Sequence, residues 1–128
     1  MTNQIELQLF KDHAARLKEM LIEEGRDRET FKTVLYYGIS VNPDRERAFR
    51  EAKTFLDAYY LKDFSREGVE IWNACGPVEH CVECLRGFIE AGVDHITIRP
   101  IGKNLDEQLQ IYLEEVLPIL QSDCVKAL

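Results

Sequence analysis

One segment constrains the fold of this sequence more than any other, residues 33–41, which are apolar on both faces of an extended chain. β-Branched and aromatic residues dominate the segment, which is typical of a strand buried on two sides in a parallel sheet. A second strand is predicted over residues 93–99, and Pro100 ends it. Because helical patterns lie between and beside these segments, the sequence predicts an α/β protein with parallel strands.

Helical periodicity is present in four segments that begin or end at residues suited to helix boundaries. Gly25 and Gly92 follow the ends of two segments, and Pro77 begins a third. Asn104 and Glu107 have the spacing of a capping box at the start of the last helix. The predicted helices cover residues 5–24, 44–59, 77–91 and 104–120.

The spacing of apolar residues predicts which side of each helix faces the core. We expect residues 61–70 to form a connection, residues 70–74 a short extended segment, and the tail from residue 121 to be frayed. The third helix is expected to bury Val78, Cys81, Val82, Leu85, Phe88 and Ile89. The last helix is expected to bury Leu105, Leu109, Tyr112, Leu113, Val116 and Leu117.

The number of strands does not match the number of helices. The chain has 128 residues, which is enough for one domain with a core. Two or three strands are too few for a parallel sheet, which normally has both faces covered and its edges paired. Four helices would cover a wider sheet, so we interpret the chain as a single domain that forms part of a larger one.

Three patterns in the sequence occur in a characteristic order. They are DRERAFREA at residues 44–52, GPVE at 76–79 leading to EAGVDHITIRP at 90–100, and EEVLPIL at 114–120. Together they resemble the C-terminal end of luciferase-like monooxygenases, oxidoreductases that use FMN or the deazaflavin F420 on a (β/α)₈ barrel. The resemblance implies a partial barrel with about four helices: a leading helix in residues 1–27, the last two βα units in 28–120, and a tail in 121–128.

The length of the chain bears on the function that this resemblance implies. A full barrel needs about 250 residues, so the first strands have no counterpart here. Because the family holds its cofactor largely on those strands, we expect the isolated chain to bind neither FMN nor F420 and to be inactive alone. The expected partner is a second copy of the chain in a homodimer or a complementary N-terminal half-barrel chain. The alternative is a non-catalytic half-barrel module that forms a homodimer through its unpaired strand edges.

The candidate site residues are those that follow the two clear strands. Active sites of (β/α)₈ barrels lie at the C-terminal ends of the strands, which selects Ser40 after the first strand and Arg99, Gly102 and Lys103 after the second. Asn73 is a further candidate, and no residue is assigned to catalysis. Arg99, Gly102 and Lys103 could hold a phosphate or sulfonate near a helix start, or they could form a solvated loop with Arg99 paired to a carboxylate.

The cysteines and histidines do not form a convincing metal site. Cys81 and Cys84 share a helix face with His80 nearby, but Cys81 belongs to the buried stripe, and no second ligand pair follows at zinc-ribbon spacing. We therefore expect no metal and reduced thiols. His13 is expected in the core, and His95 at the N-terminal end of its strand, away from a barrel's catalytic side.

The charge balance excludes some classes of partner. Sixteen basic and 23 acidic residues give a net charge of −7, which does not suit a general nucleic-acid or anionic-membrane binder. The sequence contains no apolar run long enough to span a bilayer and no secretory pattern at its N-terminus. We therefore expect a cytoplasmic protein.

Overall fold

A parallel sheet forms the centre of the protein, whose structure is a computed structural model that describes residues 2–3 and 5–126. Its central strand is β2 (Val34–Val41). Strand β4 (His95–Pro100) pairs with β2 along one edge, and β1 (Thr2–Asn3) and β3 (Asn73–Gly76) pair with it along the other. The predicted parallel α/β architecture is therefore confirmed.

The pairing register makes this sheet three strand positions wide. β1 pairs with Leu35 and Tyr36 of β2, whereas β3 begins opposite Gly38. The two short strands thus follow one another along the same edge of β2. The other edge of β2 is paired with β4 from Val34 to Ile39.

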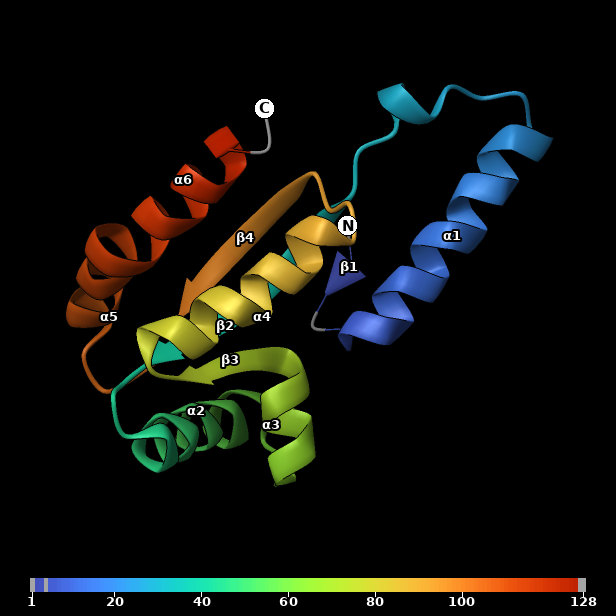
Figure 1. Cartoon of the computed structure of the whole chain (residues 1–128). Coiled ribbons are helices and arrows are strands. Elements are labelled where there is room, and N and C mark those ends of the chain that lie inside the picture. Colours follow the sequence, from blue (N-terminus) through green and yellow to red (C-terminus); the bar gives the residue numbers. More distant parts are fainter. Residues whose placement is uncertain (1, 4, 127–128) are drawn as a thin grey trace.

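Helices connect the strands as expected, and the structure adds one short helix, α3 (Arg66–Trp72; Figure 1). A short helix replaces the predicted connection, because Ser65 caps its start by accepting a hydrogen bond from the Gly68 N–H at 3.0 Å. The extended segment predicted at residues 70–74 begins later, at Asn73, and the tail predicted to be frayed is helical to Lys126. The helices are α1 (Leu7–Glu23), α2 (Arg45–Tyr60), α3 (Arg66–Trp72), α4 (Val78–Glu90), α5 (Leu105–Ile111) and α6 (Leu117–Lys126), with a 3₁₀ turn at Arg28–Thr30 and a π-helical turn at Tyr112–Val116.

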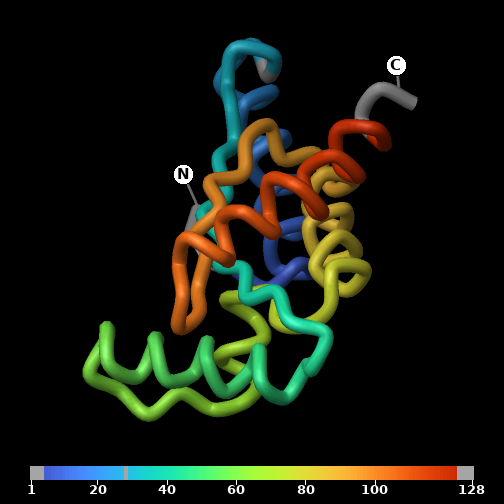
Figure 2. Tube along the Cα trace, turned by 90° about the vertical axis from the view of Figure 1, so that its left-hand side faces the viewer, coloured from blue at the N-terminus to red at the C-terminus, as the bar shows by residue number. Residues whose placement is uncertain are grey.

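The main core lies on one face of the sheet. Alternate residues of β2 pack there against α4 and the last helices, and the predicted inward face of α4 is confirmed. Figure 2 shows α4, α5 and α6 on this side of the strands, and no helix of the described residues covers the opposite side. On that open face Tyr36 is half-buried, and its partner Thr97 and the nearby His95 are exposed. Because a closed barrel buries this face, the open face is consistent with a sheet that is only part of a barrel.

A second, smaller core lies beneath the C-terminal ends of the strands. Helix α2 crosses there, below the strand ends in Figure 2. Its buried residues Ala48, Ala52 and Leu56 pack with Val69 of α3 and with Ile101, which follows β4. This core fixes α2 at the edge of the sheet where a barrel enzyme has its active site.

The predicted inward face of the last helix is confirmed only in part: Val116 is buried and Tyr112 packs against the main core, but the prediction is wrong for the leucines. Leu105, Leu109 and Leu113 are 53%, 45% and 50% exposed, whereas Gln108 is buried. Gln108 faces inward because its amide hydrogen-bonds to the end of β2, and this rotation leaves the leucines facing away from the sheet. The predicted capping box start is confirmed, since Asn104 Oδ1 accepts a hydrogen bond from the Glu107 N–H at 3.1 Å.

Helix α1 packs less closely than its apolar stripe suggests. Phe10 and Leu21 are buried, but His13 and Met20 are exposed, so the predicted core position of His13 is wrong. The helix contacts α4 near its own start, where Leu7 lies against Gly87. Its later turns lie apart from the sheet in Figure 1, and Ala14 and Leu17 in the middle of the stripe are only half-buried.

Candidate functional site

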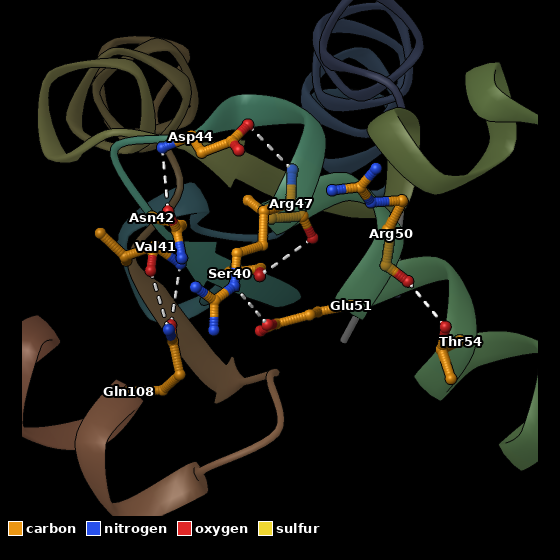
Figure 3. A network of polar contacts seen from close by, with 10 residues as sticks. Ser40, Val41, Asn42, Asp44, Arg47, Arg50, Glu51, Thr54 and Gln108 are labelled. Carbon is orange, nitrogen blue, oxygen red and sulfur yellow. Dashed lines mark hydrogen bonds and ion pairs between the residues drawn. The ribbon is translucent and has the colours of Figure 1, made fainter.

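The loop after β2 is held by side-chain hydrogen bonds at the start of α2 (Figure 3). Asn42 Oδ1 accepts a hydrogen bond from the Asp44 N–H at 2.9 Å, and Asp44 Oδ1 accepts one from the Arg47 N–H at 3.2 Å. These two acceptors satisfy donors that a helix start leaves unpaired. They set the direction in which α2 leaves the sheet, and therefore which α2 residues face the strand ends.

Ser40 is buried in this region and has a structural role. Its hydroxyl donates a hydrogen bond to the Ala48 carbonyl at 3.1 Å, which ties β2 to the first turn of α2 (Figure 3). The residue is fully buried and does not belong to the lining of the groove described below. Ser40, one of the site residues predicted from the sequence, therefore stabilises the position of α2 and is not exposed to a ligand.

Asn73 is also buried, at the junction of α3 and β3. Its Nδ2 donates a hydrogen bond to the Val69 carbonyl at 2.8 Å, while its Oδ1 has no hydrogen-bond partner among the described residues. The amide lies directly over Gly38, because a Cβ placed on Gly38 would be 1.8 Å from Asn73 Oδ1. Asn73 thus packs inside the fold and does not reach the surface where Arg99 and Lys103 lie.

The end of β2 is completed by a side chain from α5. Gln108 Oε1 accepts a hydrogen bond from the Val41 N–H, and its Nε2 donates to the Val41 carbonyl, both at 2.8 Å (Figure 3). The amide replaces the backbone partner that β4 no longer provides, since their pairing stops at Ile39. Gly102 permits this arrangement, because a Cβ there would lie 2.9 Å from Gln108 Cγ.

A groove of about 750 Å³ lies between α2 and the loop after β4. Arg47 Nε donates a hydrogen bond to Glu51 Oε1 at 3.1 Å on one side of it. The other charged residues of the lining are Arg50 and Lys103, both exposed. The full lining consists of Arg47, Arg50, Glu51, Thr54, Phe55, Ala58 and Tyr59 of α2 with Gly102 and Lys103.

Arg99 contacts the aromatic wall of this groove. Its guanidinium lies 4.5 Å from the ring centroid of Phe55 and 4.4 Å from that of Tyr59. The two rings are stacked on each other, with centroids 5.6 Å apart. Cation–π contact therefore positions Arg99, and the expected alternative of an ion pair with a carboxylate is not found among the described residues.

The structure thus brings some predicted residues together and separates others. Gly102 and Lys103 line the groove and Arg99 lies against its wall, whereas Ser40 and Asn73 lie in the interior. Sequence reasoning missed Arg47, Arg50 and the aromatic pair. A signal was present, because Arg47 and Arg50 are three positions apart and Phe55 and Tyr59 are four apart, all outside the buried Ala48–Ala52–Leu56 stripe.

The cysteines behave as buried apolar residues where they are described. Burial raises the pKa of the Cys75 and Cys81 thiols to about 12, so both stay protonated near neutral pH. Cys84 Sγ lies 3.6 Å from His80 Nε2, and burial together with Arg45 lowers the pKa of that imidazole. No group of three or more metal-ligating side chains occurs within the part of the chain that the structure describes, and the Cys124 side chain lies outside it.

Comparison with known proteins shows that this chain is similar to part of several longer enzymes. No model of a protein family matches the sequence. The F420-dependent glucose-6-phosphate dehydrogenase of Nakamurella multipartita is 24% identical over 125 residues, which cover 83% of this chain and 37% of the dehydrogenase. An F420-dependent secondary alcohol dehydrogenase, solved with an F420–acetone adduct, superimposes with a TM-score of 0.74 at 16% identity, over 90% of this chain and 41% of that one.

Two further solved structures show the same fold. The F420-dependent tetrahydromethanopterin reductase of Methanopyrus kandleri has a TM-score of 0.68 at 16% identity, over 88% of this chain and 42% of the reductase. The riboflavin lyase RcaE, solved with modified FMN and riboflavin, has a TM-score of 0.65 at 14% identity, over 94% of this chain and 37% of the lyase. The resemblance to the luciferase-like family is confirmed.

The chain matches only part of each of these barrel proteins. The chain spans 37–42% of the length of the relatives it matches. Its fold is accordingly a portion of a luciferase-like (β/α)₈ barrel, with parallel strands and helices on the outer face. Across the described residues, no helix is both long and apolar enough to cross a membrane.

Proposed function

We propose that this chain forms part of a luciferase-like F420- or FMN-dependent oxidoreductase and is active only when the rest of the barrel is supplied. The sheet is three strand positions wide where a closed barrel has eight strands, and the chain covers 37–42% of the relatives' length. The open face with Tyr36, His95 and Thr97 would become the barrel interior. A cytoplasmic location is part of this proposal.

The residues present do not fit a complete site for FMN or F420. At the strand ends, Ser40 and Asn73 are buried in hydrogen bonds to the backbone, and Arg99 is held against Phe55 and Tyr59. The open face of the sheet would form one wall of a cofactor site, and the described residues provide no strands to enclose the cofactor on its other sides. We therefore assign no reaction step to this chain, and Arg99 would at most orient an anionic substrate in the completed barrel.

Titration with FMN and with F420 tests this proposal. We expect the isolated chain to show no stoichiometric micromolar binding and no change in the absorption bands of either cofactor, because most of the surface that would enclose the cofactor is absent. The Nakamurella dehydrogenase serves as the positive control for F420. Micromolar stoichiometric binding by the isolated chain, with a shifted cofactor spectrum, would show that the site is complete and contradict the proposal.

A homodimeric, non-catalytic module is the second candidate, and the leucine stripe Leu105, Leu109 and Leu113 is the observation that favours it. A stripe of this kind beside the unpaired edge of β4 resembles an interface without its partner. Two copies, however, bring only six strand positions, which is fewer than the eight of a closed barrel. A complementary chain therefore fits better than a second copy.

Light scattering after size-exclusion chromatography separates the two candidates. The homodimer requires a stable dimer in the absence of cofactor, and the substitution Leu109→Gln should convert that dimer to a monomer because it places an amide in the stripe. Leu61→Gln is the matched control, since Leu61 is 91% exposed at the end of α2. We expect a monomer or weak self-association for the unmodified chain, and a tight dimer that Leu109→Gln dissociates would instead establish the module.

A further inference from the structure

The groove between α2 and the loop after β4 differs in charge from the rest of the molecule. Its lining contains three cations, Arg47, Arg50 and Lys103, and one carboxylate, Glu51, whereas the whole chain carries a net charge of −7. Glu51 is already paired with Arg47. Arg50 and Lys103 form no ion pair within 4 Å among the described residues, although Arg50 acts on the Glu46 carboxylate from farther away. Both cations can therefore reach a ligand in the groove.

The same groove has an apolar wall made of aromatic rings. Phe55 is half-buried and Tyr59 is 60% exposed, and Ala58 lies between them on the helix. The contact of Arg99 with both rings holds them in place and adds a further positive charge behind them. A surface of this kind has room for a flat or apolar group beside the cations.

We propose that this groove is a binding site for a small organic anion. The phosphate or carboxylate of the ligand would interact with Arg50 and Lys103, and its apolar or aromatic body would lie on Phe55, Ala58 and Tyr59. Every lining residue comes from this chain, so the site needs neither a completed barrel nor a bound cofactor. Because both cations are exposed, we expect a dissociation constant of about 0.1–1 mM.

Nuclear magnetic resonance titration of the ¹⁵N-labelled chain with 1-naphthyl phosphate tests the proposal. We expect saturable shifts of the backbone amides of Thr54, Gly102 and Lys103. Inorganic phosphate lacks the apolar body and 1-naphthol lacks the charge, so both should bind more weakly than 1-naphthyl phosphate. If 1-naphthol bound as tightly as 1-naphthyl phosphate, the cations would not contribute to binding. If inorganic phosphate bound as tightly, the aromatic wall would not contribute. Either result would overturn the proposal.

Charge variants locate the binding. The double substitution Arg50→Gln with Lys103→Gln should weaken 1-naphthyl phosphate binding about tenfold, since each exposed cation contributes modestly. Glu51→Gln should strengthen it, because it removes the carboxylate from the lining without changing the size of the side chain. Lys18→Gln, on the exposed side of α1, is the matched control and should leave binding unchanged.

Two results of the variant series would overturn the assignment. The first is a loss of affinity in Lys18→Gln as large as that in the double variant, which would mean that the overall charge of the chain governs binding. The second is an unchanged affinity in the double variant. The cofactor test has a separate readout, because it measures micromolar stoichiometry and cofactor absorption, whereas this test measures amide shifts at the groove.

Discussion

The substitution Gly38→Ala is expected to lower the free energy of unfolding by about 3 kcal/mol, because it introduces a methyl group where the core has no space. The new Cβ would lie 1.8 Å from Asn73 Oδ1 and 2.9 Å from Ile101 Cδ1. Gly38 is in the middle of β2, paired with β3 on one side and β4 on the other, so the strand cannot shift to relieve the overlap. Urea unfolding followed by circular dichroism measures the change.

Two further variants make this expectation specific. Gly68→Ala is the matched control, because a Cβ there meets its nearest neighbour, Ser65 Oγ, at 3.3 Å in a helix that favours alanine. Its free energy of unfolding should stay the same or rise by up to about 1 kcal/mol. Asn73→Ala in the Gly38→Ala background should recover part of the loss, since Asn73 causes the closest contact. If Gly38→Ala were as stable as Gly68→Ala, the packing of Asn73 over β2 would be wrong.

The substitution Gln108→Leu is expected to cost about 2–4 kcal/mol, because it leaves two buried backbone groups of Val41 without partners. Both groups bond to the Gln108 amide at 2.8 Å, and Val41 is almost completely buried. Leucine has a similar volume, so the loss would come from the missing hydrogen bonds and not from a cavity. The same urea unfolding measurement reports the difference.

Gln110→Leu provides the matched control on the same helix. Gln110 is exposed, and its described side-chain hydrogen bond joins it to Glu114 on the surface, so its replacement should cost less than about 0.5 kcal/mol. Similar losses for Gln108→Leu and Gln110→Leu would show that Gln108 does not complete the end of β2. The leucine stripe would then have no structural reason to face outward.

The local structure was largely predictable from the sequence. The two-sided apolar segment became the central strand β2, Cys81 lies in the buried face of α4, and Asn104 caps the last helix as its spacing with Glu107 predicts. Each of these features depends on residues a few positions apart, which interact in the same way whatever the rest of the chain does. The mismatch between strands and helices was also visible and indicated part of a larger domain; the family resemblance implied a partial barrel, which the similar folds confirm.

The candidate site was predicted only in part. Arg99, Gly102 and Lys103 lie at the groove, but Arg50, Phe55 and Tyr59 come from α2, a helix to which the sequence assigned no site residue. Ser40 and Asn73 were selected because they lie near strand ends, and both are used inside the fold. Sequence position shows which end of a strand a residue occupies, but it does not show whether the side chain reaches solvent.

The sequence by itself determined the elements, their parallel arrangement and the incomplete width of the sheet, because periodicity and capping act over short distances. Only the tertiary structure decided that Gln108 faces inward and that Arg99 lies on Phe55 and Tyr59. Gln108 and Val41 are 67 residues apart, and they meet because the register of β2 with β4 ends two residues before Val41. Contacts of that kind depend on where whole elements meet, which no local pattern in the chain encodes.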